Sequence, residues 1–187
     1  MATTLTSGSV REPELSNSGI WRIGSLIVAP LDLQKTTDRE CLGYAYTRFE
    51  REGLLGRIFG DVAPGLPAIV RCLLEIPLLG LFKQEEWEAH GKILGIAWAE
   101  PEAVSAEVGL AFFRRAGSRA ERIELGKMAS RWALERLGLQ ELTCQISEKH
   151  RAAIRYMQAV GFEEVERSGG AYLGRFRAEQ GRHEYHA

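Results

Sequence analysis

Four arginines cluster where the sequence passes from an apolar run into a long helical pattern. The segment RRAGSRAER, residues 114–122, contains Arg114, Arg115, Arg119 and Arg122. The first amide groups of a helix have no partner within the helix, so a basic loop before a helix suits an anion such as phosphate. The segment predicts either a phosphate-binding loop or a solvated basic turn, and spacing alone leaves both open.

A second group of reactive side chains lies in HRAAIRYMQAVGF, residues 150–162. The pattern predicts a short helix that ends at Gly161, since glycine readily adopts the left-handed conformation that closes many helices. His150 and Tyr156 carry groups that can donate a proton, whereas the thioether of Met157 has none to give.

The elements that must position these residues follow from the apolar periodicity. We expect strands at residues 24–31, 78–86, 91–100, 106–113 and 140–147, a final hairpin around residues 169–170, and helices at 32–53, 68–75 and 150–160. The strongest helix has one apolar stripe, which contains Leu125, Met128, Ala129, Trp132, Ala133 and Leu137, and it ends at Gly138. Residues 60–67 and 114–122 are expected loops. This order predicts a mixed α/β domain with strand–helix–strand units in its second half.

Composition excludes several classes of protein. The 187 residues include 24 basic and 25 acidic side chains, so the formal net charge is −1 and no nucleic-acid partner is expected. We expect one domain over residues 21–180, a mobile leader at 1–20 and a frayed tail at 181–187 that binds no metal. The apolar run 66–82 is too short and interrupted to span a membrane. It predicts a buried helix and strand, or a wall facing an apolar ligand.

Cysteine usage indicates a reducing compartment. Cys41, Cys72 and Cys144 are far apart, odd in number and without metal-ligand spacing. We therefore expect reduced, buried thiols in a cytoplasmic protein.

The second half of the chain resembles the GNAT acetyltransferase superfamily. AEVGLAFF resembles its Glu-bearing strand, ERIELGKMASRWALERLGLQEL its long helix, and HRAAIRYMQAVGF its last helix, of the form N-x-x-A-x-x-x-Y-x-x-x-G-F. GKILGIAWAE is similar to the preceding strand, and the family's spacing runs from Glu107 to Phe162 without a gap. The resemblance implies a GNAT-like α+β fold, with a mixed, mostly antiparallel central sheet flanked by helices.

The resemblance also implies a reaction, which is transfer of an acetyl group from acetyl-coenzyme A to an amine of a small molecule or a protein. No metal is expected to take part. Family members often form homodimers, so a homodimer is one expectation. The acceptor is set by the variable first half, where no motif identifies it.

The family's pyrophosphate loop, R/Q-x-x-G-x-G/A, is altered in this sequence. Without a gap its three fixed positions fall on Gly117, Ala120 and Arg122. A shifted register places Arg114, Gly117 and Arg119 there instead. The implied donor-binding set is Val108, Leu110 and Phe112 for the pantetheine arm, through their backbone, and Arg114, Arg115, Gly117, Ser118, Arg119, Ala120 and Arg122 for the phosphates.

Three residues are candidates for proton transfer by this resemblance. Glu107 is the candidate base, with a solvent-facing edge carboxylate as the alternative. His150 occupies the family's Asn position and could be a donor, a base or a surface residue. Met157 occupies the position of the family's proton-donating Tyr, so Tyr156 is either a substitute donor or an aromatic with a satisfied hydroxyl.

Three hypotheses follow from these features. The first is an active N-acetyltransferase, and the second is a GNAT-fold binding protein that has lost donor binding. The third is an acyltransferase that uses a longer acyl-coenzyme A or an acyl-carrier protein, which the apolar run 66–82 and the arginine cluster would suit.

Overall fold

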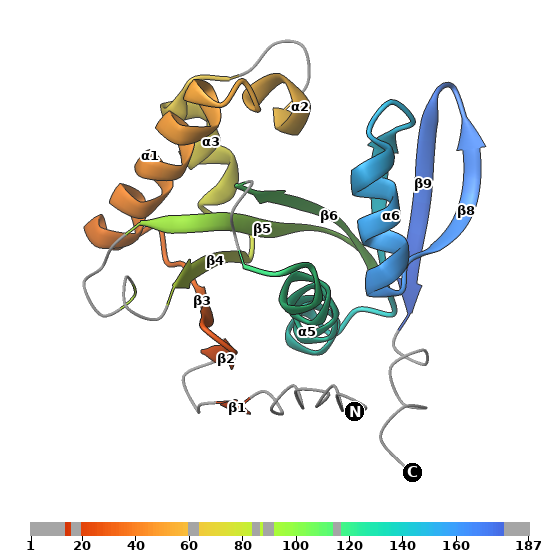
Figure 1. Cartoon of the computed structure of the whole chain (residues 1–187), viewed down its shortest axis with the longest axis horizontal. Coiled ribbons are helices and arrows are strands. Elements are labelled where there is room, and N and C mark those ends of the chain that lie inside the picture. The colour runs from red at the N-terminus through yellow and green to blue at the C-terminus, as the bar shows by residue number, and fades with distance from the viewer. Residues whose placement is uncertain are drawn as a thin grey trace, which may run out of the picture.

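The computed structural model describes residues 14–15, 20–59, 64–83, 87, 92–113 and 117–177 (Figure 1). Nine strands form one sheet in the order β1-β2-β3-β4-β5-β6-β7-β9-β8. β6 and β7 are parallel neighbours, and the other pairs among the described strands are antiparallel. A mixed, mostly antiparallel sheet flanked by helices was predicted and is confirmed.

The first half contains a hairpin where a single strand was predicted. β1 (Glu14–Leu15) pairs with β2 (Trp21–Ile23), and β2 pairs with β3 (Leu26–Pro30). Gly24 has φ +57° and turns the chain between β2 and β3, so the strand predicted at residues 24–31 begins too early. A residue with positive φ leaves the extended backbone that a strand needs.

Three helices follow on one face of the sheet. They are α1 (Thr36–Arg51), α2 (Leu55–Phe59) and α3 (Leu66–Leu73), and they are grouped together in Figure 1. Their apolar sides share a core with the inner strands through Leu42, Phe49 and Ile69. The helices predicted at 32–53 and 68–75 are present, whereas α2 was not predicted.

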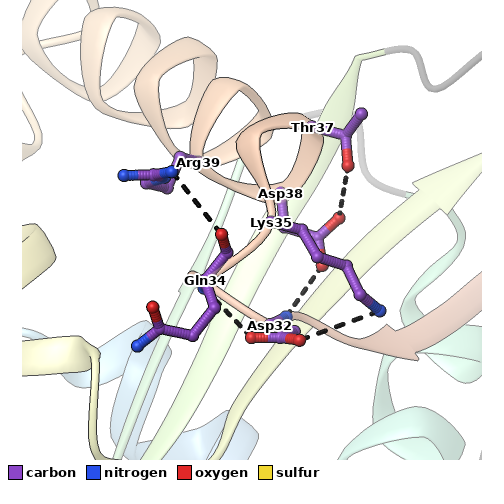
Figure 2. A network of polar contacts seen from close by, with 6 residues as sticks. All are labelled: Asp32, Gln34, Lys35, Thr37, Asp38 and Arg39. Carbon is purple, nitrogen blue, oxygen red and sulfur yellow. Dashed lines mark hydrogen bonds and ion pairs between the residues drawn. The ribbon is translucent and has the colours of Figure 1, made fainter.

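The start of α1 is later than predicted because a polar network shapes residues 32–35 as a turn (Figure 2). The Asp38 carboxylate accepts a hydrogen bond of 2.8 Å from the backbone N–H of Asp32, and the Asp32 carboxylate accepts one of 3.0 Å from the N–H of Gln34. Lys35 adds an ion pair to Asp32 at 3.8 Å. Side chains that bind nearby backbone groups in this way favour turns over helix.

The second half follows the predicted order closely. It contains β4 (Leu78–Lys83), β5 (Ile93–Glu102), β6 (Ser105–Phe112), α5 (Arg119–Leu137), β7 (Glu141–Ser147), α6 (Arg151–Val160), β8 (Glu163–Ser168) and β9 (Ala171–Arg177). β5 and β6 form the predicted hairpin. Gly138 and Gly161 close α5 and α6 in the left-handed conformation, as predicted.

Helices α5 and α6 each pack into a core cluster. α5 packs on the sheet through Leu125, which lies with Trp21 and Leu79. The rings of Trp21 and Trp132 make an edge-to-face contact with centroids 5.5 Å apart. α6 contributes Ile154 and Met157 to a cluster with β7 and β9. α5 therefore lies on the sheet face opposite α1 to α3, as Figure 1 shows.

The cysteines differ from expectation at one position. Cys41 and Cys144 are buried free thiols, whereas Cys72 of α3 is an exposed one. The tail predicted at residues 181–187 and most of the predicted leader lie outside the described residues. No helix in the described part of the chain is long and apolar enough to cross a membrane.

Candidate active site

The site is created by the divergence of two neighbouring parallel strands. β6 and β7 pair from Ser105 opposite Glu141 to Glu107 opposite Thr143, and their pairing stops there. The Thr143 hydroxyl donates to the carbonyl oxygen of Ala106 at 3.4 Å, close to this last pair. Beyond Glu107 the outer edge of β6 has no neighbouring strand among the described residues. Its backbone groups are therefore available to a ligand.

An open groove occupies this divergence. Its polar lining residues include Arg57, Glu100, Glu107, Arg119, Arg122, Lys149, His150, Arg155 and Tyr156. Its apolar wall includes Val108, Leu110, Phe112 and Met157 on one side, and Ile69 and Leu73 of α3 on the other. The predicted base and pantetheine strand, both on β6, are thus brought to one place with His150 and Tyr156 at the N-cap and in the middle of α6. Of the apolar run 66–82, which could form a wall, Ile69 and Leu73 of α3 line the groove.

Glu107 marks the point where the strands part. Its side chain is exposed, and Glu100 lies directly opposite on β5. Partial burial of the carboxyl raises the pKa of Glu107 above its usual range, and the nearby charges of Glu100 and Glu102 raise it further. A carboxylate with a raised pKa is a better proton acceptor at neutral pH.

The positive side chains of the groove come mainly from helices. Arg119 and Arg122 lie in the first turn of α5, Arg155 lies in α6 and Arg57 lies in α2, while Lys149 directly precedes the N-cap of α6. The groove therefore has an acidic part at β5 and β6 and basic side chains around it, which suits one cationic and one anionic ligand group.

The loop predicted at residues 114–122 ends earlier than expected. α5 begins at Arg119, so Arg119, Ala120 and Arg122 are helical rather than loop residues. The reason is a capping box, in which Ser118 Oγ accepts from the N–H of Glu121 at 3.2 Å and Glu121 Oε2 accepts from the N–H of Ser118 at 2.8 Å. Gly117, with φ +70°, directly precedes the cap. Arg114 and Arg115 lie outside the described residues.

The Glu121 carboxylate already occupies part of this helix start. Hydrogen bonds from the backbone and hydroxyl of Ser118 lower the pKa of Glu121, with further contributions from the backbone of Ser25 and from Arg122. A β-carbon at Gly24 would overlap the same carboxylate. Glu121 therefore joins the start of α5 to the turn between β2 and β3, as an internal anion at the positive end of the helix.

Arg122 and Tyr156 also make hydrogen bonds to backbone groups at the start of α5. The Arg122 guanidinium donates to the carbonyl oxygen of Gly117 at 2.8 Å, and the Tyr156 hydroxyl donates to the carbonyl oxygen of Arg122 at 2.8 Å. The rings of Tyr156 and Phe112 make an edge-to-face contact with centroids 5.7 Å apart. Burial raises the pKa of Tyr156 well above its usual range, so its proton is held tightly.

The remaining groups on α6 and β7 have distinct environments. His150 is the N-cap residue of α6, makes no side-chain cap hydrogen bond and lines the groove half-buried. Met157 lines it as well but is buried within the α6 core cluster. Cys144 of β7 reaches the groove, where burial raises its pKa to about 12. A thiol with so high a pKa is not a nucleophile at neutral pH, since the thiolate is the reactive form.

Sequence reasoning missed two residues that shape the site. Glu100 was not singled out, because its position opposite Glu107 depends on the register of the β5–β6 hairpin. Glu121 could have been found from the spacing Ser-x-x-Glu in residues 118–121, which is a known signature of a helix start.

Solved acetyltransferases share this fold. A GNAT-family acetyltransferase from Bacillus anthracis has 10 % identity and a TM-score of 0.61, over 86 % of this chain and 99 % of that chain. The ribosomal-protein-S5-alanine acetyltransferase from Vibrio fischeri has 10 % identity and a TM-score of 0.64, over 84 % and 96 %. The Campylobacter jejuni N-acetyltransferase PseH in complex with acetyl coenzyme A has 14 % identity and a TM-score of 0.56, over 81 % and 99 %.

No family model matches the chain, and no curated protein matches it by sequence. The structural likeness nevertheless extends over most of this chain and nearly all of each solved chain. The protein has the GNAT fold, as the spacing from Glu107 to Phe162 predicted.

Proposed function

We propose that the protein is an N-acyltransferase that transfers an acetyl group from acetyl-coenzyme A to a primary amine. The observation that carries the proposal is the groove between β6 and β7, with Glu107 at the last paired position and a basic helix start beside it. The solved proteins of the same fold add support, since they are acetyltransferases and one holds acetyl coenzyme A.

The proposed donor is held in two ways. Its phosphates lie near Arg119 and Arg122, whose guanidinium groups can bind them through charge-assisted hydrogen bonds. Its pantetheine arm lies along the unpaired edge of β6, where Val108, Leu110 and Phe112 supply backbone partners. Holding the donor and the amine together in one groove supplies much of the acceleration of such a reaction.

The proposed reaction begins at the acidic part of the groove. A primary amine reaches the enzyme largely protonated, and Glu100 and Glu107 attract its positive charge. Glu107 accepts a proton, directly or through water, and the freed amine attacks the thioester carbonyl carbon. The C–N bond forms, the C–S bond breaks, and the thiolate leaves with a proton.

Three groups could donate a proton to the thiolate. Met157 has no proton to give, while the Tyr156 hydroxyl lines the groove and already donates to the Arg122 carbonyl oxygen. Tyr156, His150 and solvent are the available sources. Tyr156→Phe and His150→Ala variants separate these sources by the loss of kcat in each.

Thermal unfolding with and without acetyl-coenzyme A tests donor binding first. A ligand at about 100 times its Kd stabilises the folded protein by about 2.7 kcal/mol. Release of free thiol in the presence of a panel of amines then tests transfer. We expect Glu107→Gln to reduce kcat/KM by about 100- to 10,000-fold, as the loss of a general base does. The control is Glu166→Gln, an exposed carboxyl on β8 away from the groove.

A second candidate function is a binding protein that no longer uses the donor. Glu121 favours it, because its carboxylate occupies an amide at the start of α5 that an anion would use. Such a protein would show no stabilisation by millimolar acetyl-coenzyme A and no thiol release. Both results together would contradict the proposal that the protein is an acyltransferase.

A further inference from the structure

A small apolar cavity of about 50 Å³ lies next to the groove. It lies between β5 and β6 on one side and α5 and α6 on the other. Its lining includes Leu79, Ala97, Ala99, Val108, Leu110, Ala129, Ala133, Met157 and Val160. Among the described residues, none that lines it carries a formal charge.

Small side chains create this space. Gly126, Ala129 and Ala133 follow each other along α5 at helical spacing, and Ala97 and Ala99 face them from β5. The polar groups of the lining are few. The Tyr156 hydroxyl donates to the Arg122 carbonyl oxygen, and Ser130 supplies one buried hydroxyl. An apolar lining of this kind favours hydrocarbon over polar groups, which would lose hydrogen bonds there.

The cavity and the groove share a wall. Both are lined by Val108, Leu110, Tyr156 and Met157, together with Trp98 and Gly109. Val108 and Leu110 follow Glu107 along β6, one and three residues further on. The cavity is therefore next to the point where the strands part.

The cavity lies on the donor side of the sheet. Ala97 packs with the α5 cluster, whereas the next residue, Trp98, packs with the α1 to α3 cluster on the other face. The basic side chains assigned to the donor, Arg119 and Arg122, come from α5. The groove wall formed by α3 is on the opposite face of the sheet, and we place the entry of the acceptor amine there.

We propose that this cavity receives the hydrocarbon end of the donor's acyl group, so that propionyl and butyryl groups are better donors than acetyl. The inference rests on the proposed function. Among the parts of the two substrates, phosphates, amides and the amine all need polar partners, which the cavity lacks. The acyl hydrocarbon needs none, and it is attached to the carbonyl carbon that reacts beside Glu107.

The chemistry of the transfer is the same for each chain length. The C–N bond to the amine forms, the C–S bond of the thioester breaks, and the amine proton ends on the thiolate. Only burial changes, and each buried methylene group strengthens binding about fourfold.

Calorimetric titration of the full chain with coenzyme A and its acetyl, propionyl, butyryl and hexanoyl thioesters tests the inference. We expect affinity to rise about fourfold per methylene from acetyl to butyryl, and to fall for hexanoyl, whose chain exceeds the cavity. Affinity that is flat or falling beyond acetyl would overturn the inference and leave the proposed function intact. Failure of coenzyme A and all its thioesters to bind would overturn both.

Two variants that fill the cavity from opposite walls sharpen the test. Ala129→Val and Ala97→Val should remove the gain for butyryl while leaving the affinity for coenzyme A unchanged. The matched control is Ala159→Val on α6, which lines neither the cavity nor the groove. Thermal unfolding verifies that each variant folds. If both fillers keep the gain for butyryl, or change only the KM of the amine, the cavity does not hold the acyl chain.

Discussion

The hydroxyl of Tyr156 donates a hydrogen bond of 2.8 Å to the backbone carbonyl oxygen of Arg122, and so ties α6 to the first turn of α5. The Arg122 side chain in turn binds the carbonyl oxygen of Gly117 at 2.8 Å. The start of α5 is therefore held by contacts from inside the protein before any ligand arrives.

Tyr156→Phe removes this link while keeping the ring. We expect the free energy of unfolding to fall by about 1 kcal/mol, and the KM of the donor to rise about fivefold as the turn loosens. The change in kcat should be smaller, because the hydroxyl proton is engaged by a carbonyl oxygen. Steady-state kinetics and chemical denaturation measure these quantities. A kcat that falls far more than the donor affinity would instead identify Tyr156 as the proton donor.

Glu100→Gln tests whether the charge of Glu100 raises the pKa of Glu107. Protonated Glu107 cannot accept a proton, so kcat/KM should fall as the pH drops through the pKa of Glu107. Because burial, Glu100 and Glu102 raise that pKa, the acid limb should lie above the ordinary value of 4.5. Removing the Glu100 charge should shift the limb to lower pH. An unchanged pH profile would show that another group controls it.

The same shift has a consequence for stability. A folded-state pKa above the unfolded value means that the folded protein binds more protons between the two values. The contribution of Glu107 to stability is therefore lost as the pH rises through its folded pKa. We expect Glu107→Gln to be as stable as the parent protein or slightly more stable at pH 7, measured by thermal unfolding. A marked loss would mean that Glu107 has a structural role.

Gly126→Ala tests the close packing of α5 and α6. A β-carbon at Gly126 would lie 2.5 Å from the Tyr156 hydroxyl oxygen and from Val160 Cγ2, so the helices must separate. We expect destabilisation by about 1–3 kcal/mol despite the better helix propensity of alanine. Gly43→Ala in α1 is the matched control, since its β-carbon would lie 3.6 Å from Leu66 Cδ2. It should stabilise by up to about 1 kcal/mol. Equal effects at both positions would contradict this view of the interface.

The strong periodic signals predicted the second half of the fold well. The stripe on α5, the glycine ends of α5 and α6 and the β5–β6 hairpin were all visible as local patterns. The first half was less predictable. The turn at Gly24 is contained within a continuous apolar run, and α2 is only five residues long, too short for a periodic signal.

The site was predictable as a set of residues but not as a set of contacts. Glu107, His150 and Tyr156 line one groove, as the resemblance implied. The link from Tyr156 to Arg122 and the pairing of Glu100 with Glu107 depend on how distant segments dock. Such contacts leave no signal in a local pattern.

Glu121→Gln tests whether the protein's own carboxylate competes with the donor's phosphates. The Glu121 carboxylate accepts from the N–H of Ser118 at 2.8 Å, at the positive end of α5. Replacing it with a neutral amide should reduce stability by about 1 kcal/mol, because a capping interaction is weakened. The pKa of Glu121 is lowered in the folded state, so its stabilisation is present above the unfolded pKa. The stability difference between parent and variant should therefore vanish as the pH falls through the folded pKa of Glu121.

Donor affinity should change in the opposite direction. Without the negative charge at the helix start, coenzyme A and inorganic pyrophosphate should bind more tightly, and the gain should shrink at high salt because exposed charges are screened. Titration calorimetry at two salt concentrations measures both effects. Glu124→Gln, two residues beyond the first turn of α5, is the control for a general change in charge. Unchanged or weaker binding of both ligands to Glu121→Gln would show that the carboxylate shapes the turn without competing for it.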